Sequence, residues 1–191
     1  MELILIRHGL PVRSQETSDP PLSPEGQEQA RRVAAVLARE RIDAVYSSTM
    51  RRAIETAQPY AAQAGHPVQT EDGIVEWDRD SGTYVPMEEL KRDNYEAWKR
   101  FVANGRDPEE ISSFQQTVVA TLEAIVAAHP RRRVAVFCHG GVINVWTAHV
   151  LAMTPRLFFE PRYTSLHRYL CAGTGERNLV SLNDTAHLQG G

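Results

Sequence analysis

The chain alternates short apolar runs with amphipathic segments of helical length, and this alternation constrains the fold more than any other feature. Three of the runs, at residues 3–6, 42–46 and 134–137, are rich in Val and Ile or Leu, as is typical of strands buried on both faces. After the first run, Ser23-Pro24 supplies a hydroxyl N-cap and a first-turn proline for a helix. The alternation predicts an α/β fold: a three-layer α/β/α sandwich with a mostly parallel central sheet.

The remaining pattern fits the same plan. We expect Ser47-Ser48 to end the second strand and cap a helix that runs through Ala64, and residues 67–69 to form a third strand. Residues 86–104 read as one amphipathic helix, and Ser112 or Ser113 as the start of another. Residues 164–170 and 177–182 read as a closing hairpin around two glycines. We therefore predict one domain over residues 1–191, with a small cap insertion at about residues 76–113.

Composition excludes several classes of protein. The chain has 191 residues, a formal net charge of -3 and 42% hydrophobic residues, so it is not the strongly basic chain expected of a general nucleic-acid binder. Its two cysteines are too few for a disulfide framework or a thiolate zinc site, and no apolar run approaches the roughly 18 residues of a membrane helix. The first residues lack the pattern of a signal peptide. We expect a cytoplasmic protein with no nucleic-acid or membrane partner; its oligomeric state, a homodimer included, stays open.

Two of the predicted strands end in the same way. ELILIRHG at residues 2–9 and RVAVFCHGG at residues 133–141 both place His-Gly directly after an apolar run. In sheets of this kind, ligands bind beyond the carboxyl ends of the strands. Because Ser47-Ser48 also follows a strand, the candidate chemistry converges on one edge of the sheet.

Two arginines accompany these histidines. Arg7 directly precedes His8, and Arg52 lies in the first turn of the helix that follows Ser47-Ser48, where backbone N–H groups also favour an anion. The planar fork of arginine suits phosphate oxygens. With His8 and His139, the two arginines would form a compact site for a dianionic phosphoryl group.

Two other chemistries fit less well. A cysteine phosphatase needs an arginine six residues after its cysteine, but the residue six after Cys138 is Asn144. A zinc site built from His8, His139 and a carboxylate is conceivable, yet arginines clustered at the same place would repel the cation. Histidine as a nucleophile remains: a neutral imidazole can attack phosphorus when its other nitrogen donates to a fixed acceptor. A phosphomonoester also needs a general acid for its leaving group.

The order of these segments resembles the histidine phosphatase superfamily, also called the phosphoglycerate mutase-like family. The resemblance spans nearly the whole chain and is carried by RHG at 7–9, LSPEGQEQA at 22–30, SSTMRRAIETA at 47–57, IVE at 74–76, FCHGGVI at 137–143 and PRYTSL at 161–166. It implies that His8 becomes phosphorylated and that Arg7, Arg52 and His139 bind the phosphoryl group. It further implies Glu76 as general acid and base, a backbone contact from Gly140, and no metal or organic cofactor.

The chain departs from the family pattern in two places. After RHG it reads LPVRS instead of an acidic or amide residue followed by Thr, so we expect Arg13 or Ser14 to take the substrate-side role. The segment after Glu76 also differs, which leaves Asp78 or Asp80 as outside candidates for the general acid.

The cap region bears on the type of reaction. A mutase must keep its phosphohistidine from water, whereas a phosphatase must admit water, and here the cap is short and aromatic. We therefore expect hydrolysis of a small-molecule phosphomonoester. A phosphoglycerate mutase-type phosphotransferase is the alternative, and a non-catalytic phospho-ligand-binding member of the fold is a third reading.

Overall fold

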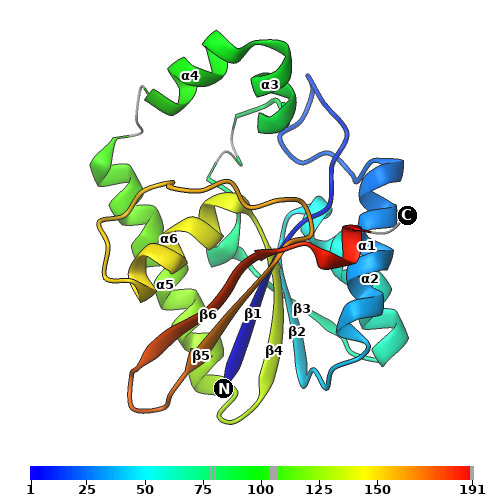
Figure 1. Ribbon diagram of the computed structural model, residues 1–191, viewed down its shortest axis with the longest axis vertical. Coiled ribbons are helices and arrows are strands. Elements are labelled where there is room, and N and C mark those ends of the chain that lie inside the picture. The colour runs from blue at the N-terminus through cyan, green and yellow to red at the C-terminus, as the bar shows by residue number, and fades with distance from the viewer. Residues whose placement is uncertain (78, 80, 104–106, 190–191) are drawn as a thin grey trace.

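The computed structural model is a six-stranded sheet covered by helices on both faces (Figure 1). It describes the chain except residues 78, 80, 104–106, 190 and 191 and the side chains of residues 87, 88 and 100–103. Its strands are β1 (Glu2–Arg7), β2 (Ala44–Ser48), β3 (Val68–Glu71), β4 (Arg133–Cys138), β5 (Leu166–Cys171) and β6 (Arg177–Asp184). Its helices are α1 (Pro24–Leu37), α2 (Arg51–Ala64), α3 (Met87–Asp93), α4 (Tyr95–Ala103), α5 (Pro108–Ala128) and α6 (Gly140–Val150), with short 3₁₀ turns η1 (Asp72–Ile74) and η2 (Ala186–Leu188).

The sheet has the order β3-β2-β4-β1-β5-β6. Strands β1, β2, β3 and β4 pair in parallel, while β5 runs antiparallel to β1 and to β6. The predicted three-layer, mostly parallel α/β architecture is therefore confirmed, and so is the closing hairpin. Because β1, β2 and β4 are parallel neighbours, the residues that follow them meet at one edge of the sheet.

Two apolar layers hold the helices to the sheet. One lies under α5 and α6, where Trp146, Leu122 and Tyr169 are fully buried. The other lies under α1 and α2, around Val33 and Leu37. Alternate residues of β1 point into one layer or the other, which explains why that strand is apolar throughout.

Local signals explain where several helices begin. The Ser23 hydroxyl accepts the Gly26 N–H at 3.0 Å, as the sequence predicted for α1. The other expected cap is wrong: Ser47 and Ser48 belong to β2, and α2 begins after Met50, which makes no side-chain capping bond. At the end of this buried strand, the Ser48 hydroxyl instead bonds to the His139 ring.

Two other helix predictions are also wrong in their boundaries. The single helix expected at residues 86–104 is broken at Asn94, whose side-chain oxygen accepts the Ala97 N–H at 3.0 Å and so starts α4 afresh. Helix α5 begins at Pro108 instead of Ser112 or Ser113, because Asp107 caps it through the Glu109 N–H at 2.9 Å. In Figure 1 the α3–α4 pair lies beyond the carboxyl edge of the sheet, on the side of the site.

Helix α5 alone among the described helices has the length and mean hydropathy that a membrane span requires. Its apolar stripe, which includes Val118 and Leu122, packs in the core against the sheet. Its Glu123 carboxylate pairs with Arg177 of β6. Helix α5 is therefore attached to the sheet both by apolar packing and by an ion pair.

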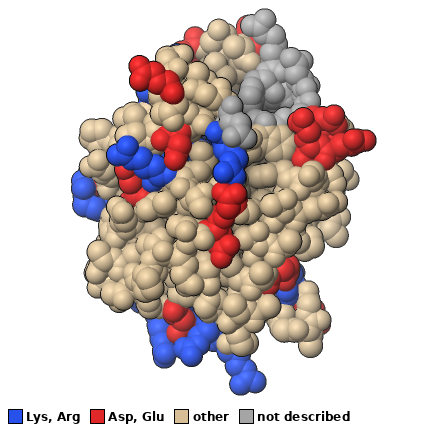
Figure 2. Space-filling model, turned by 180° about the vertical axis from the view of Figure 1, so that it is seen from behind, with Lys and Arg blue, Asp and Glu red and all other residues tan. Residues whose placement is uncertain are grey.

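The charged side chains are mixed in sign on the face opposite the view of Figure 1. Figure 2 shows basic and acidic groups side by side there, in keeping with the small net charge of -3. On that face the described residues do not form an extended basic surface of the kind that binds nucleic acid.

Candidate functional site

His8 follows the last residue of β1, and its ring is held in one orientation. The Nδ1 atom lies 2.7 Å from the carbonyl oxygen of Gly9. Because a carbonyl oxygen can only accept, Nδ1 must carry the proton, which leaves the lone pair on Nε2. The backbone around it is also fixed, since the Gly9 N–H donates to the Thr56 hydroxyl at 2.9 Å. The fixed acceptor that this chemistry requires is therefore the backbone carbonyl of Gly9.

His139 caps the N-terminus of α6 and lies against His8. The ring centroids are 5.1 Å apart, at an angle of 57°. The Nε2 atom of His139 is 2.6 Å from the hydroxyl of Ser48, at the end of β2. Its Nδ1 atom is buried and has no hydrogen-bond partner among the residues that the structure describes. An orphaned polar atom of this kind suits a site whose remaining partner is a ligand oxygen.

Arg52 projects from the first turn of α2 and is completely buried. Its Nε atom points to the Nε2 atom of His8 at 3.3 Å, and Nη1 donates to the carbonyl oxygen of Ser18 at 2.8 Å. The Asp19 carboxylate lies 3.6 Å from Nη1, and the ring of Tyr84 lies 4.8 Å from the guanidinium carbon. The arginine is thus aimed at the nitrogen that carries the lone pair.

Arg7 approaches the same place from the end of β1. Its Nη1 atom donates to the carbonyl oxygen of Pro161 at 2.5 Å. The face of the Tyr163 ring lies 4.0 Å from its guanidinium carbon, and the same ring lies 5.8 Å from that of His8.

The two guanidinium groups set the charge of the site. Burial lowers the pKa of His8 well below its usual value, and the positive charges of Arg52 and Arg7 lower it further. The pKa of His139 is likewise lowered, by burial first and then by Arg52. Both imidazoles are therefore neutral at pH 7, while the arginines keep their charge. The result is a pocket with a positive field and an uncharged, oriented nitrogen.

Glu76 reaches the site from the segment after η1. Its carboxylate accepts the Gly141 N–H at 3.1 Å, from the first turn of α6, and the Trp77 N–H, also at 3.1 Å. A Cβ atom built at Gly141 would overlap Glu76 Oε1, so the carboxylate can keep this position only while residue 141 has no side chain. A Cβ atom at Gly140 would lie 3.8 Å from Arg7 Nε and 4.0 Å from Glu76 Oε2, which places both side chains at the same helix end.

The structure thus brings together Arg7, His8, Arg52, His139 and Glu76, the five residues that the sequence proposed as catalytic. Gly140 lies among them at the start of α6.

The two other substrate-side candidates make different contacts. Arg13 is exposed, and its charge acts on Asp93 of α3. The Ser14 hydroxyl accepts the backbone N–H groups of Glu16 and Thr17, and its backbone pairs with Tyr84. No described contact joins Arg13 or Ser14 to the histidines, so their role stays a prediction. Asp78 and Asp80 lie outside the described residues.

Sequence reasoning missed several residues of the site. Ser48 was assigned to a helix cap, although its hydroxyl bonds to His139. Tyr84 and Tyr163 stack on the two arginines, and Thr56 fixes Gly9. Tyr163 falls within the segment PRYTSL, so the motif indicated this segment but not the contact of Tyr163 with Arg7.

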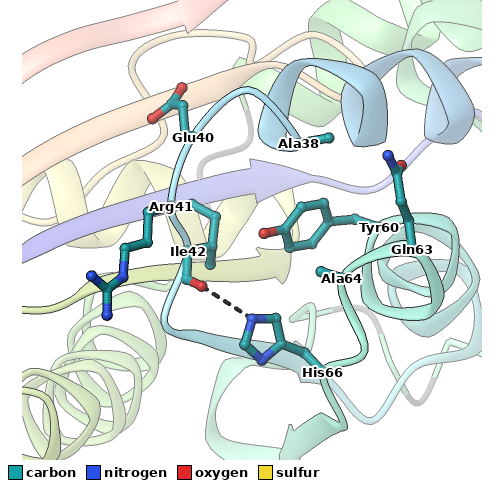
Figure 3. Close-up of a pocket in the computed structure, with 8 residues that line it drawn as sticks. All are labelled: Ala38, Glu40, Arg41, Ile42, Tyr60, Gln63, Ala64 and His66. Carbon is teal, nitrogen blue, oxygen red and sulfur yellow. Dashed lines mark hydrogen bonds between the residues drawn. The ribbon is translucent and has the colours of Figure 1, made fainter.

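A cavity of about 270 Å³ lies away from this cluster, between the C-terminal ends of α1 and α2 (Figure 3). Its lining includes Tyr60, Gln63 and His66, and the His66 Nε2 atom lies 3.1 Å from the carbonyl oxygen of Ile42. None of the five clustered residues lines it. In the described parts of the chain, no group of three or more His, Cys, Asp or Glu side chains is arranged to hold a metal ion.

The chain is similar in sequence to known proteins over most of its length. A sequence model of the histidine phosphatase superfamily (branch 1) matches residues 3–185. Phosphoserine phosphatase 1 of Hydrogenobacter thermophilus is 32% identical over 204 residues, covering 98% of this chain and 94% of that protein. The phosphoglycerate mutase-like protein 4 of Arabidopsis thaliana is also 32% identical, over 156 residues, covering 75% of this chain and 68% of that protein.

The fold has a similar counterpart among solved structures. A phosphoserine phosphatase of Entamoeba histolytica, solved in complex with 3-phosphoglyceric acid, superimposes with a TM-score of 0.76 at 27% identity. The match covers 98% of each chain. The similarity therefore includes the sheet, both helical layers and the segments that carry the cluster.

Proposed function

The chain belongs to the histidine phosphatase superfamily, and we propose that it hydrolyses phosphomonoesters through a phosphohistidine formed on Nε2 of His8. The observation that carries this proposal is the hydrogen bond between Nδ1 of His8 and the Gly9 carbonyl, which leaves Nε2 unprotonated beside Arg52. A neutral, oriented imidazole next to a bound dianion is the arrangement that nucleophilic attack on phosphorus requires.

The reaction then proceeds in two displacements. In the first, the Nε2 lone pair forms a bond to phosphorus as the bond to the ester oxygen breaks, and Glu76 gives that oxygen its proton. In the second, the Glu76 carboxylate takes a proton from water, the water oxygen attacks phosphorus, and the bond to Nε2 breaks. Inorganic phosphate leaves, and both side chains return to their starting protonation states.

Charge on the transferring group is met by residues already in place. Arg7 and Arg52 both bring positive charge to His8, and His139 offers an Nδ1 atom that has no hydrogen-bond partner among the described residues. Because these groups are buried, little reorganisation is needed as charge spreads over the equatorial oxygens. The site therefore favours the transition state over the free ester.

The relatives bear on the choice of substrate. Two similar proteins are named phosphoserine phosphatases, one of them solved with 3-phosphoglyceric acid. Phosphoserine and 3-phosphoglyceric acid both carry a carboxylate close to the phosphate. We propose that a small phosphorylated acid is the substrate class, and that the protein is cytoplasmic, in line with its two free cysteines.

A phosphoester panel tests the proposal. We expect turnover of phosphoserine, 3-phosphoglycerate or p-nitrophenyl phosphate that falls about 10³-fold or more in His8→Ala, and an acid-labile phosphoenzyme that this variant does not form. His66→Ala, which changes a histidine far from the cluster, should keep wild-type activity.

Wild-type protein that neither hydrolyses the panel nor yields a phosphoenzyme would establish a non-catalytic role. Interconversion of 3- and 2-phosphoglycerate faster than hydrolysis would establish a mutase.

A further inference from the structure

One loop holds the guanidinium of Arg7 in place. The loop spans residues 160–165, between α6 and β5. It supplies the Pro161 carbonyl that accepts from Nη1 at 2.5 Å and the Tyr163 ring that covers the guanidinium face at 4.0 Å. Stacking on an aromatic face fixes the plane of a guanidinium while leaving its in-plane N–H groups able to reach acceptors. These two contacts therefore set the direction in which the Arg7 fork points.

The same loop is bonded to the backbone of the nucleophile. The Thr164 N–H lies 3.1 Å from the Arg7 carbonyl and 3.3 Å from the His8 carbonyl. Thr164 has a φ of 54°, a left-handed conformation that a β-branched residue rarely adopts and that costs free energy. The left-handed conformation of Thr164 therefore lowers the stability of the folded state, while the loop that contains it packs against the end of β1.

Asn183 of β6 ties the loop to the sheet from the other side. Its Oδ1 atom accepts the Arg162 N–H at 2.7 Å, and its Nδ2 atom donates to the Glu160 carbonyl at 3.1 Å. The two bonded residues lie on either side of Pro161, and Arg162 directly precedes Tyr163. Asn183 has a φ of 57°, and it lies where the β5–β6 register shifts between Leu166 and Arg168. At this irregularity in the hairpin, the side chain of Asn183 bonds to the loop.

We propose that Tyr163 is a positioning residue for Arg7, and that Asn183 acts on the same arginine by holding the loop on which Tyr163 and Pro161 lie. Neither is required to touch the reacting atoms. The inference rests on the proposed function, because it assigns Arg7 to the phosphoryl group. Its physical basis is that a planar fork binds phosphate oxygens well only in a narrow range of orientations.

Four variants test the proposal with p-nitrophenyl phosphate as substrate and orthovanadate as inhibitor. Tyr163→Leu removes the aromatic face, and we expect kcat/KM to fall about 10- to 100-fold, with the inhibition constant for vanadate rising in parallel. Tyr163→Phe keeps the face and should restore both values to within about threefold of wild type. Asn183→Gly removes both side-chain bonds without straining a left-handed residue, and it should lower kcat/KM in the same manner. Asn178→Gly, at an exposed position of the same strand, is the matched control and should change neither value.

A double-mutant cycle separates positioning from direct contact with substrate. In an Arg7→Ala background, we expect Tyr163→Leu and Asn183→Gly to have no further effect on kcat/KM, because their target is absent. Losses that add to that of Arg7→Ala, or a Tyr163→Leu enzyme with wild-type constants, would overturn the inference. If His8→Ala and Arg7→Ala themselves left activity unchanged, the proposed function would fail instead. Urea unfolding midpoints near the wild-type value in the single variants would confirm that the constants report on folded protein.

Discussion

The Nδ1 atom of His8 lies 2.7 Å from the carbonyl oxygen of its own neighbour, Gly9. A residue one position along the chain thus fixes the tautomer of the proposed nucleophile. The Gly9 backbone is in turn held by Thr56 of α2, the helix that also carries Arg52. The proposed nucleophile and the proposed phosphate-binding Arg52 are therefore positioned by the same two elements, β1 and α2.

The pH dependence of kcat/KM should report the lowered pKa of His8. Burial is the largest cause of the shift and the charge of Arg52 the next. Since only the neutral ring can attack phosphorus, activity should persist as pH falls below 6.5 and be lost only well below it. Arg52→Gln removes the second cause and should move this acidic midpoint upward, toward 6.5. A wild-type midpoint near 6.5 that Arg52→Gln does not shift would contradict the account.

Glu76→Gln should affect esters according to their leaving groups. A carboxamide keeps the size of the side chain but only one acceptor oxygen, so it can accept from the Gly141 N–H or from the Trp77 N–H but not from both, and the transferable proton is lost. We expect kcat/KM for an alkyl phosphate to fall about 10²- to 10⁴-fold, and for p-nitrophenyl phosphate by about tenfold or less. Equal losses for both esters would assign the proton donor to another group.

Gly141→Ala should mimic Glu76→Gln through sterics alone. The added methyl group would overlap Glu76 Oε1, so the carboxylate must move away from the start of α6. We expect a loss of kcat of about 10- to 100-fold, larger for alkyl than for aryl esters. Gly173→Ala is the control, because a Cβ atom there meets nothing within 4 Å. Wild-type activity in Gly141→Ala would show that the position of Glu76 is not critical.

His167 should make the folded state sensitive to acid. It is buried in β5, its Nε2 atom lies 2.8 Å from the Ser165 hydroxyl, and burial lowers its pKa to about 3. In the unfolded chain this histidine takes up a proton near pH 6.5, whereas in the folded chain it stays neutral down to about pH 3. Each unit by which the pH falls between 6.5 and 3 therefore lowers the free energy of unfolding by about 1.4 kcal/mol. Compared with His167→Gln, the wild type should therefore lose about 2 kcal/mol of unfolding free energy between pH 7 and pH 5. Urea unfolding at several pH values measures this difference, and parallel pH curves for the two proteins would rule the assignment out.

Local pattern alone determined the architecture and most of the cluster. Apolar runs interrupted by helical segments predicted the layered sheet, because each strand or helix signals its burial through its own residues. The rule that the carboxyl ends of parallel strands meet at one edge of a sheet predicted that Arg7, His8 and His139 lie together. Where prediction failed, a side chain had two possible partners: Ser48 can cap a helix or bond to a distant histidine, and only the packed sheet selects His139.

Tertiary structure alone decided how the site is oriented. The aim of Arg52 at Nε2 of His8 and the place of Glu76 against Gly141 depend on how separate elements pack. Tyr163 lies far from Arg7 in sequence, and the loop that joins them requires a left-handed Thr164. No periodicity encodes such a contact, because it results from loop geometry and long-range packing and not from the preference of any one residue. The sequence therefore predicted which of the catalytic candidates meet, and the fold decided how they face one another and which further residues contact them.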